Sequence, residues 1–162
     1  MTVSIIKYSK HKESRGENYT IYDKSLIAND FSYDKVSTSH KGVIRGFHGD
    51  SYTTKLISIL HGSVKLVTYD LNNHLKQEFI ISSDDDEVVT VLIPPNHLNA
   101  HQCLSDKCIF FYKWDHPYSL EKQYSVQYND KIINPNWFNL KPIVSERDLK
   151  SENLNELIDR IS

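Results

Sequence analysis

Short runs of β-branched and aromatic residues, separated by turn residues, follow one another along most of this chain. Three of these runs, at residues 54–61, 63–70 and 75–81, are joined by turn signals at Gly62 and at Asn72-Asn73. Tight turns at this spacing join antiparallel neighbours, so the three runs predict a meander. Further strands are expected at residues 3–8, 18–22, 31–39, 43–48, 88–93, 99–104, 107–114 and 123–128.

No helical period alternates with these strands, which favours an antiparallel β-sandwich or barrel of the jelly-roll kind. A charged loop is expected at residues 11–17, between the first two strands. Only the tail changes period, with a helical stripe of apolar residues at Leu154, Leu157, Ile158 and Ile161. The stripe predicts one C-terminal helix within residues 149–161, packed as a lid or brace. We therefore expect an all-β fold with a short C-terminal helix, in one domain that spans residues 1–162.

Composition narrows the classes of protein to which the chain can belong. Its formal net charge is −2, without a long run of Lys or Arg, which argues against a nucleic-acid-binding protein. No apolar stretch approaches the roughly 18 residues that a membrane-spanning helix needs. The first apolar run is too short for a secretory signal, and the two cysteines, Cys103 and Cys108, are too few for a disulfide framework. We expect a cytoplasmic location.

Residues 43–50, Val-Ile-Arg-Gly-Phe-His-Gly-Asp, carry charge in a strand-like run and so resemble a site. A lone histidine such as His48 is usually a satisfied structural group. However, Lys55 follows after a short polar connection, and His101 and Tyr112 lie in two later strand runs. A base, a cation and a phenol together suit the transfer of a proton next to a carbonyl group.

Arg45 and His48 pose a geometric problem, because residues three apart face opposite ways in a regular strand. A bulge or twist at Gly46 would turn both side chains into one pocket. Alternatively, Arg45 serves a site across a dimer interface. The sequence leaves both solutions open.

Several segments match one known family in the same order along nearly the whole chain. They include Ser14-Arg15-Gly16, the Arg-Gly-x-His motif at residues 45–48, Thr54-Lys55-Leu56, Ala100-His101, Phe111-Tyr112-Lys113 and the Ser-x-x-Asp motif at residues 145–148. On these motifs the chain resembles the dTDP-4-dehydrorhamnose 3,5-epimerase family, whose members are cupin-type jelly rolls.

The resemblance implies an epimerase that inverts C3, C5 or both in a nucleotide-diphosphate 4-keto sugar. The keto group acidifies the neighbouring C–H bonds, so a base can form an enolate that is reprotonated from the other face. The resemblance assigns His48 as the general base paired with Asp148, and Tyr112 as the general acid. Lys55 then supplies positive charge for the enolate oxygen. No cofactor and no metal ion is expected to be needed.

The same resemblance implies a set of substrate-binding residues and a homodimer. The expected substrate contacts are Arg15 and Arg45 at the diphosphate, His101 and Lys55 at the sugar, Tyr118 beside the pocket, and Tyr19 and Asn99. Family members pair so that N-terminal strands contribute to the partner's pocket. Arg15 is therefore expected to serve the site of the neighbouring chain.

Departures from the usual family pattern indicate a particular branch. Asn18 and Thr20 stand where family members usually carry Phe and Glu, and a loop is missing between Asp70 and Phe79. The segments at 48–50 and 99–101 instead resemble the branch that acts on GDP-linked 4-keto-heptoses in capsule and other surface-polysaccharide biosynthesis. We therefore expect a GDP-4-keto-heptose, with dTDP-4-dehydrorhamnose 3,5-epimerase or sugar 3,4-ketoisomerase activity as the alternatives.

Two other classes of protein fit the sequence less well. A metal-dependent cupin enzyme would use His48, His97 and His101, but such a site needs imidazoles and a carboxylate that converge on one face. A non-catalytic sugar-binding jelly roll is compatible with the fold, since a fold alone does not determine function. The joint presence of a base, a cation, a phenol and a C-terminal carboxylate argues against it.

Overall fold

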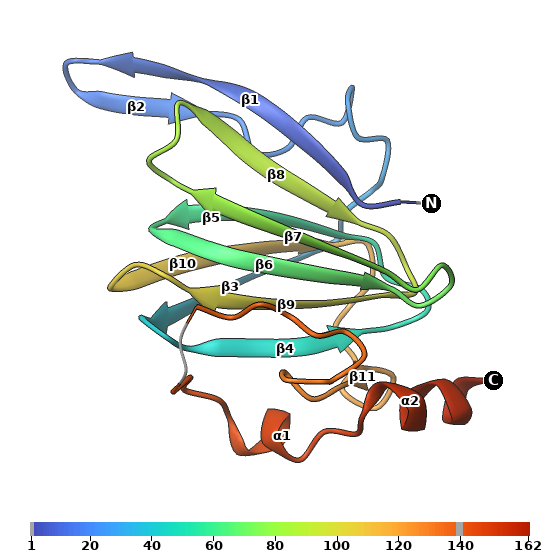
Figure 1. Cartoon of the computed structure of the whole chain (residues 1–162). Helices are drawn as coiled ribbons and strands as arrows, with labels where there is room; N and C mark the ends of the chain where they lie inside the picture. The colour runs from blue at the N-terminus through green and yellow to red at the C-terminus, as the bar shows by residue number, and fades with distance from the viewer. Residues whose placement is uncertain (1, 139–140) are drawn as a thin grey trace.

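The computed structural model describes residues 2–138 and 141–162, which form two antiparallel β-sheets and two short helices (Figure 1). The six-stranded sheet has the order β2-β1-β8-β5-β10-β3, with β1 (Ser4–Glu13), β2 (Gly16–Tyr19), β3 (Tyr33–His40), β5 (Lys55–His61), β8 (Glu87–Ile93) and β10 (Lys107–Trp114). The five-stranded sheet has the order β11-β4-β9-β6-β7, with β4 (Ile44–Gly49), β6 (Ser63–Asp70), β7 (Leu75–Ser82), β9 (His97–Cys103) and β11 (Tyr124–Ser125). The predicted all-β jelly-roll class is confirmed.

One hydrophobic core lies between the two sheets and follows from the two-residue strand period. Its buried members include Ile57 and Ile59 of β5, Val64 and Leu66 of β6, and Phe110 of β10. Each side chain of this size contributes roughly 1.5–3 kcal/mol when it is fully removed from water. The burial of these side chains holds the two sheets together.

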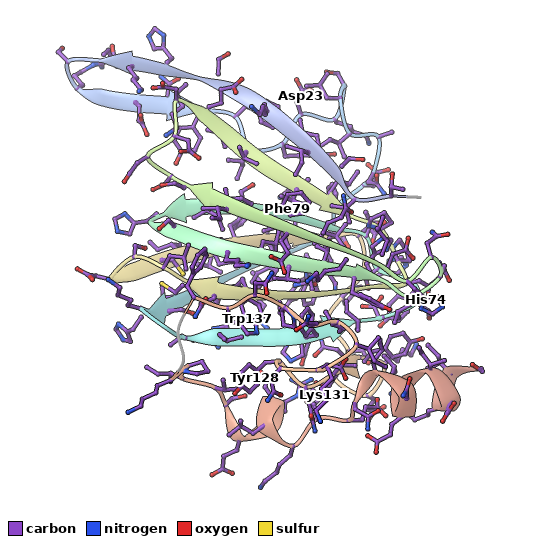
Figure 2. All side chains as sticks on the ribbon, in the orientation of Figure 1. Asp23, His74, Phe79, Tyr128, Lys131 and Trp137 are labelled. Atoms are coloured by element: carbon purple, nitrogen blue, oxygen red, sulfur yellow. The ribbon has the colours of Figure 1, made fainter. Side chains whose placement is uncertain are left out.

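A second core covers the opposite face of the five-stranded sheet. Phe47 of β4 and Leu98 of β9 are buried there against Leu154 and Leu157 of the C-terminal segment. Figure 2 shows Trp137 on this side, where its ring packs 6.2 Å from that of Phe47. The C-terminal segment is therefore a brace that holds β4 in place.

The predicted meander of β5, β6 and β7 is wrong. The chain leaves the six-stranded sheet at Gly62, and only β6 and β7 pair with each other. Gly62 has a φ of 75°, and a Cβ atom there would lie 2.2 Å from the carbonyl oxygen of Lys107. After this turn the chain enters the other sheet, so β5 and β6 face each other across the core. Two packed sheets bury the apolar faces of both strands more completely than one flat sheet would.

The expected charged loop at residues 11–17 is also wrong, because most of it is strand. β1 and β2 form a hairpin in which Lys10 and Glu17 make an ion pair of 3.2 Å. β1 pairs with β8 only as far as Ser9, and Figure 1 shows the rest of the hairpin projecting beyond β8. This part covers no core, so its sequence lacks the apolar alternation by which strands are recognised.

Two helices replace the single C-terminal helix that was predicted. α1 (Glu146–Leu149) begins after Ser145, whose side chain accepts a hydrogen bond from the amide of Asp148. α2 (Leu154–Ile161) begins at a capping box formed by Asn153 and Glu156, a local signal that was present in the sequence. In the described part of the chain, neither helix has the length and apolar character needed to cross a membrane.

Candidate active site

A pocket of about 460 Å³ lies between the two sheets. It is lined by residues of β3, β5 and β10 from one sheet, of β4 and β9 from the other, and of the segments after β10 and around α1. Its volume is within the roughly 300–1,000 Å³ that is common for small-molecule sites. The lining includes seven residues expected from the sequence, namely Arg45, His48, Lys55, Asn99, Tyr112, Tyr118 and Asp148.

A bulge in β4 brings Arg45 and His48 to the same face. Arg45 lies opposite His101 and His48 lies opposite Asn99, so three residues of β4 span two residues of β9. Gly46 sits inside the bulge with a φ of 119°, and a Cβ atom there would lie 2.6 Å from the carbonyl oxygen of Asn99. Glycine at this position therefore lets a base and a cation three residues apart share one pocket.

His48 and Asp148 form a hydrogen-bonded pair at the pocket wall. Nε2 of His48 lies 2.8 Å from Oδ1 of Asp148, and the amide of Gly46 donates to Oδ2 at 3.2 Å. Burial opposes ionisation of Asp148. The hydrogen bond and the charge of His48, together with the hydrogen bond from the Gly46 amide, outweigh the effect of burial, so the pKa of Asp148 is lowered. An ionised carboxylate accepts a hydrogen bond from Nε2–H, so in the neutral ring the proton stays on Nε2 and the free lone pair is on Nδ1.

Lys55 contributes a buried cation from the opposite sheet. It is only 3% exposed, and its Nζ donates to Oδ1 of Asn99 at 3.3 Å and lies 5.9 Å from the centre of the Trp114 ring. Burial lowers the pKa of Lys55, although the charge of Asp50 opposes this shift. Such an ammonium group is available to stabilise negative charge that develops in the pocket.

Tyr112 reaches the pocket from β10, so it approaches from the sheet opposite that of His48. Its ring packs 4.5 Å from that of Phe110 and 5.9 Å from that of Trp114. Burial raises the pKa of Tyr112 to about 12, with Ser37 and Arg45 acting in the opposite direction. Its hydroxyl group therefore carries a proton across the physiological range and can donate it.

Positive charge dominates the pocket. Its lining contains the cations Lys35, Arg45, Lys55 and Arg147 but, among the described residues, only one carboxylate, Asp148. Such an excess of positive charge attracts an anionic ligand. Phosphate groups suit it well, because guanidinium groups bind phosphate oxygens in a bidentate manner.

His101, expected at the sugar, does not line the pocket of this structure, and its contact with the substrate stays a prediction. It is buried beneath the pocket lining, with its ring stacked on Phe110 at 3.9 Å between centres. Burial, followed by the charges of Arg45 and His48, lowers the pKa of His101 to about 3, so the ring is neutral. His101 lies opposite Arg45 in the pairing of β4 with β9, and its ring packs against Phe110 of the other sheet.

Arg15 and Tyr19 also lie outside the pocket of their own chain. The Arg15 side chain is 82% exposed in the β1–β2 turn, where it pairs with Glu13. Tyr19 lies at the end of β2 under the ammonium group of Lys10. Neither residue lines this pocket, and the predicted contacts of Arg15 and Tyr19 with a substrate stay predictions, as does the role of Arg15 in a neighbouring chain.

Three charged or aromatic residues of the lining, Lys35, Trp114 and Arg147, were not assigned to the site from the sequence. Trp114 was recognisable, because it follows Tyr112 by two residues and so shares its face. Arg147 precedes Asp148 in the Ser-x-x-Asp motif, and its guanidinium donates to Gln123 at 2.7 Å. Lys35 left no such signal, since it enters the pocket only because β3 pairs with β10 and places it beside Tyr112.

The histidines that were considered for a metal site do not converge. His97 lies 3.5 Å from Asp70 and is absent from the pocket lining. Within residues 2–138 and 141–162, no group of three or more His, Cys, Asp or Glu residues is placed to hold a metal ion.

Comparisons with known proteins agree on one family. Residues 1–156 match the family model described as dTDP-4-dehydrorhamnose 3,5-epimerase. The dTDP-4-dehydrorhamnose 3,5-epimerase of Shigella flexneri is 27% identical over 129 residues, which are 76% of this chain and 71% of that protein.

Two solved structures give the same result. The crystal structure of dTDP-4-dehydrorhamnose 3,5-epimerase from Bacillus anthracis, with TDP and PPi bound, has a TM-score of 0.87 and 26% identity, covering 94% of both chains. The dTDP-6-deoxy-D-glucose-3,5-epimerase from Legionella pneumophila, in complex with dTDP-4-keto-L-rhamnose, has a TM-score of 0.86 and 27% identity. That comparison covers 94% of this chain and 88% of the Legionella chain.

Proposed function

Because the chain belongs to the dTDP-4-dehydrorhamnose 3,5-epimerase family and is a sugar-nucleotide epimerase, we propose that it inverts C3 and C5 of a dTDP-linked 4-keto-6-deoxyhexose. The observation that carries this proposal is the placement of two proton-transferring groups in one pocket. The His48–Asp148 pair approaches from the five-stranded sheet, and Tyr112 approaches from the six-stranded sheet.

The proposed reaction proceeds through an enolate. Nδ1 of His48 removes the proton from the carbon next to the keto group, and the electrons of that C–H bond move to the keto oxygen. Asp148 stabilises the imidazolium ion that forms. Lys55 stabilises the enolate oxygen, an effect of roughly 2.7–4 kcal/mol for one well-placed donor. Tyr112 then donates its proton to the opposite face of the carbon, and the configuration is inverted.

The relatives support dTDP as the nucleotide. The Bacillus structure holds TDP and PPi, and the Legionella structure holds dTDP-4-keto-L-rhamnose. The comparisons give no support to the GDP-linked heptose that the sequence favoured. It remains the second candidate, because Asn18 and Thr20 depart from the usual family pattern in the β1–β2 hairpin and the loop that follows it.

A panel of 4-keto sugar nucleotides in deuterated water tests the substrate. We expect dTDP-4-keto-6-deoxyglucose to incorporate deuterium at C3 and C5 and to be inverted at both carbons, as followed by NMR. We expect GDP-linked 4-keto-heptoses to react with a lower kcat/KM. A higher kcat/KM with a GDP-linked heptose would reverse the assignment of the nucleotide and the sugar. A 3-keto product would indicate a ketoisomerase. No reaction with any member of the panel would reject the proposal.

We also propose a homodimer in which the β1–β2 hairpin reaches the pocket of the partner. The hairpin extends beyond its pairing with β8, and Arg15 at its turn is exposed and absent from the pocket lining of its own chain. Cyclic dimers are the commonest symmetric assembly, and they allow each chain to complete the site of the other. This arrangement would place a cation at the anionic end of the substrate.

Mixing two defective variants tests this arrangement. In a mixed dimer of Arg15→Ala and His48→Asn chains, one site combines an intact His48 with an intact Arg15 from the partner. Random exchange should therefore restore roughly a quarter of the wild-type sites, measured as kcat after mixing. If Arg15 serves its own chain, the mixture stays as inactive as its components. A monomer by light scattering would also contradict the proposal.

A further inference from the structure

Lys55 is a buried cation whose immediate surroundings lack a counterion. Within residues 2–138 and 141–162, its ammonium has a single hydrogen-bond partner, the neutral amide oxygen of Asn99 at 3.3 Å. Trp114 offers a ring face, and Asp50 acts only through its more distant charge. A buried charge that lacks a close ionic partner is unfavourable, so the site retains it at a cost in stability.

Asn99 lies between His48, the proposed base, and Lys55, the proposed cation for the enolate. It lies on β9 directly opposite His48, it is 6% exposed, and it lines the pocket. Its contact with Lys55 crosses from the five-stranded to the six-stranded sheet. Asn99 is thus placed to determine where the ammonium group points relative to the proposed base.

We propose that Asn99 is a positioning residue that keeps the Lys55 ammonium charged and directed at the substrate oxygen that becomes negative during the reaction. This inference rests on the proposed function, since an enolate is the species that needs the charge. Asn99 acts through Lys55 and takes no part in proton transfer itself.

The electrostatics around Lys55 explain why an acceptor is needed there. The other charged and titratable groups that line the same pocket are Lys35 of β3, Arg45 and His48 of β4, Tyr112 of β10, Tyr118 in the segment after β10, and Arg147 and Asp148 of α1. Asp50, in the loop before β5, acts on Lys55 through its charge. Burial lowers the pKa of Lys55, and only the charge of Asp50 opposes this shift. A hydrogen bond from the ammonium to an amide oxygen favours the charged form and so also opposes the effect of burial.

Two substitutions of Asn99 separate positioning from a merely structural role. Asn99→Leu removes the acceptor, which lowers the pKa of Lys55, so the alkaline limb of the kcat profile should move down by about one pH unit. The maximal kcat should fall roughly tenfold or more, as expected for a lost charge-assisted hydrogen bond. Asn99→Asp keeps the shape but adds a negative charge, which raises the pKa of Lys55 and moves the same limb upward.

The alkaline limb reports Lys55 because the other proposed acid titrates higher, with the pKa of Tyr112 at about 12. Thr68→Val is the matched control, since Thr68 pairs with Asn99 on β6 and is buried outside the pocket lining. It should leave the limb in place. A limb that stays unmoved in both Asn99 variants while the wild type turns over substrate would overturn the inference.

A second measurement does not depend on turnover. NMR titration of the Lys55 side chain, labelled at Cε, should give a lower midpoint in Asn99→Leu and a higher midpoint in Asn99→Asp than in the wild type. If the wild type fails with the whole substrate panel, the proposed function is rejected, and the titration still decides whether Asn99 holds the charge. Equal midpoints in the three proteins would overturn the inference regardless of activity.

Discussion

His48→Asn is expected to abolish both deuterium exchange and inversion, with a loss of about 10²–10⁴-fold or more in kcat/KM. The proposed base is Nδ1 of His48, because Nε2 is occupied by Asp148 at 2.8 Å. Asparagine has a side chain of similar polarity but cannot accept the proton. The measurement is NMR of C3 and C5 in deuterated water, beside the rate of product formation.

His97→Asn is the matched control for this variant. His97 also lies beside a buried carboxylate, Asp70 at 3.5 Å, but it does not line the pocket. The control should retain exchange and inversion in its folded fraction, which circular dichroism can measure. Exchange at the wild-type rate in His48→Asn would remove His48 from the mechanism and show that another group is the base.

Tyr112→Phe is expected to separate exchange from inversion. The variant keeps the ring and its packing against Phe110 but loses the hydroxyl that donates from the opposite sheet. The enolate should still form, and the protonated His48 should return the proton to the original face. The variant should therefore incorporate deuterium while inversion falls by about 10²–10⁴-fold.

The pH dependence of Tyr112 gives this prediction a second check. Its pKa is raised to about 12, so the hydroxyl stays protonated below that pH and Tyr112 contributes no titration near neutrality. Tyr69→Phe, which removes a tyrosine hydroxyl outside the pocket, should leave both activities in place. Normal inversion in Tyr112→Phe would instead point to Tyr118 or to water as the donor.

Local sequence patterns determined much of the fold and of the candidate site. The two-residue period placed Tyr112 correctly on the inner face of β10, because successive side chains of a strand point to opposite faces. Ordered motifs identified His48, Lys55 and Asp148 as one group, and the pocket contains all three. The all-β class followed from short strands and turns, since these signals depend on neighbouring residues alone.

Only the tertiary structure decided which strands are neighbours and which side chains meet. The crossing at Gly62 placed β5 and β6 in different sheets, and the pairing of β3 with β10 brought Lys35 into the pocket. The bulge at Gly46 brought Arg45 to the pocket lining together with His48, whereas His101 is buried outside that lining. Such contacts join residues far apart in the chain, so they depend on how whole sheets pack, which no local period encodes.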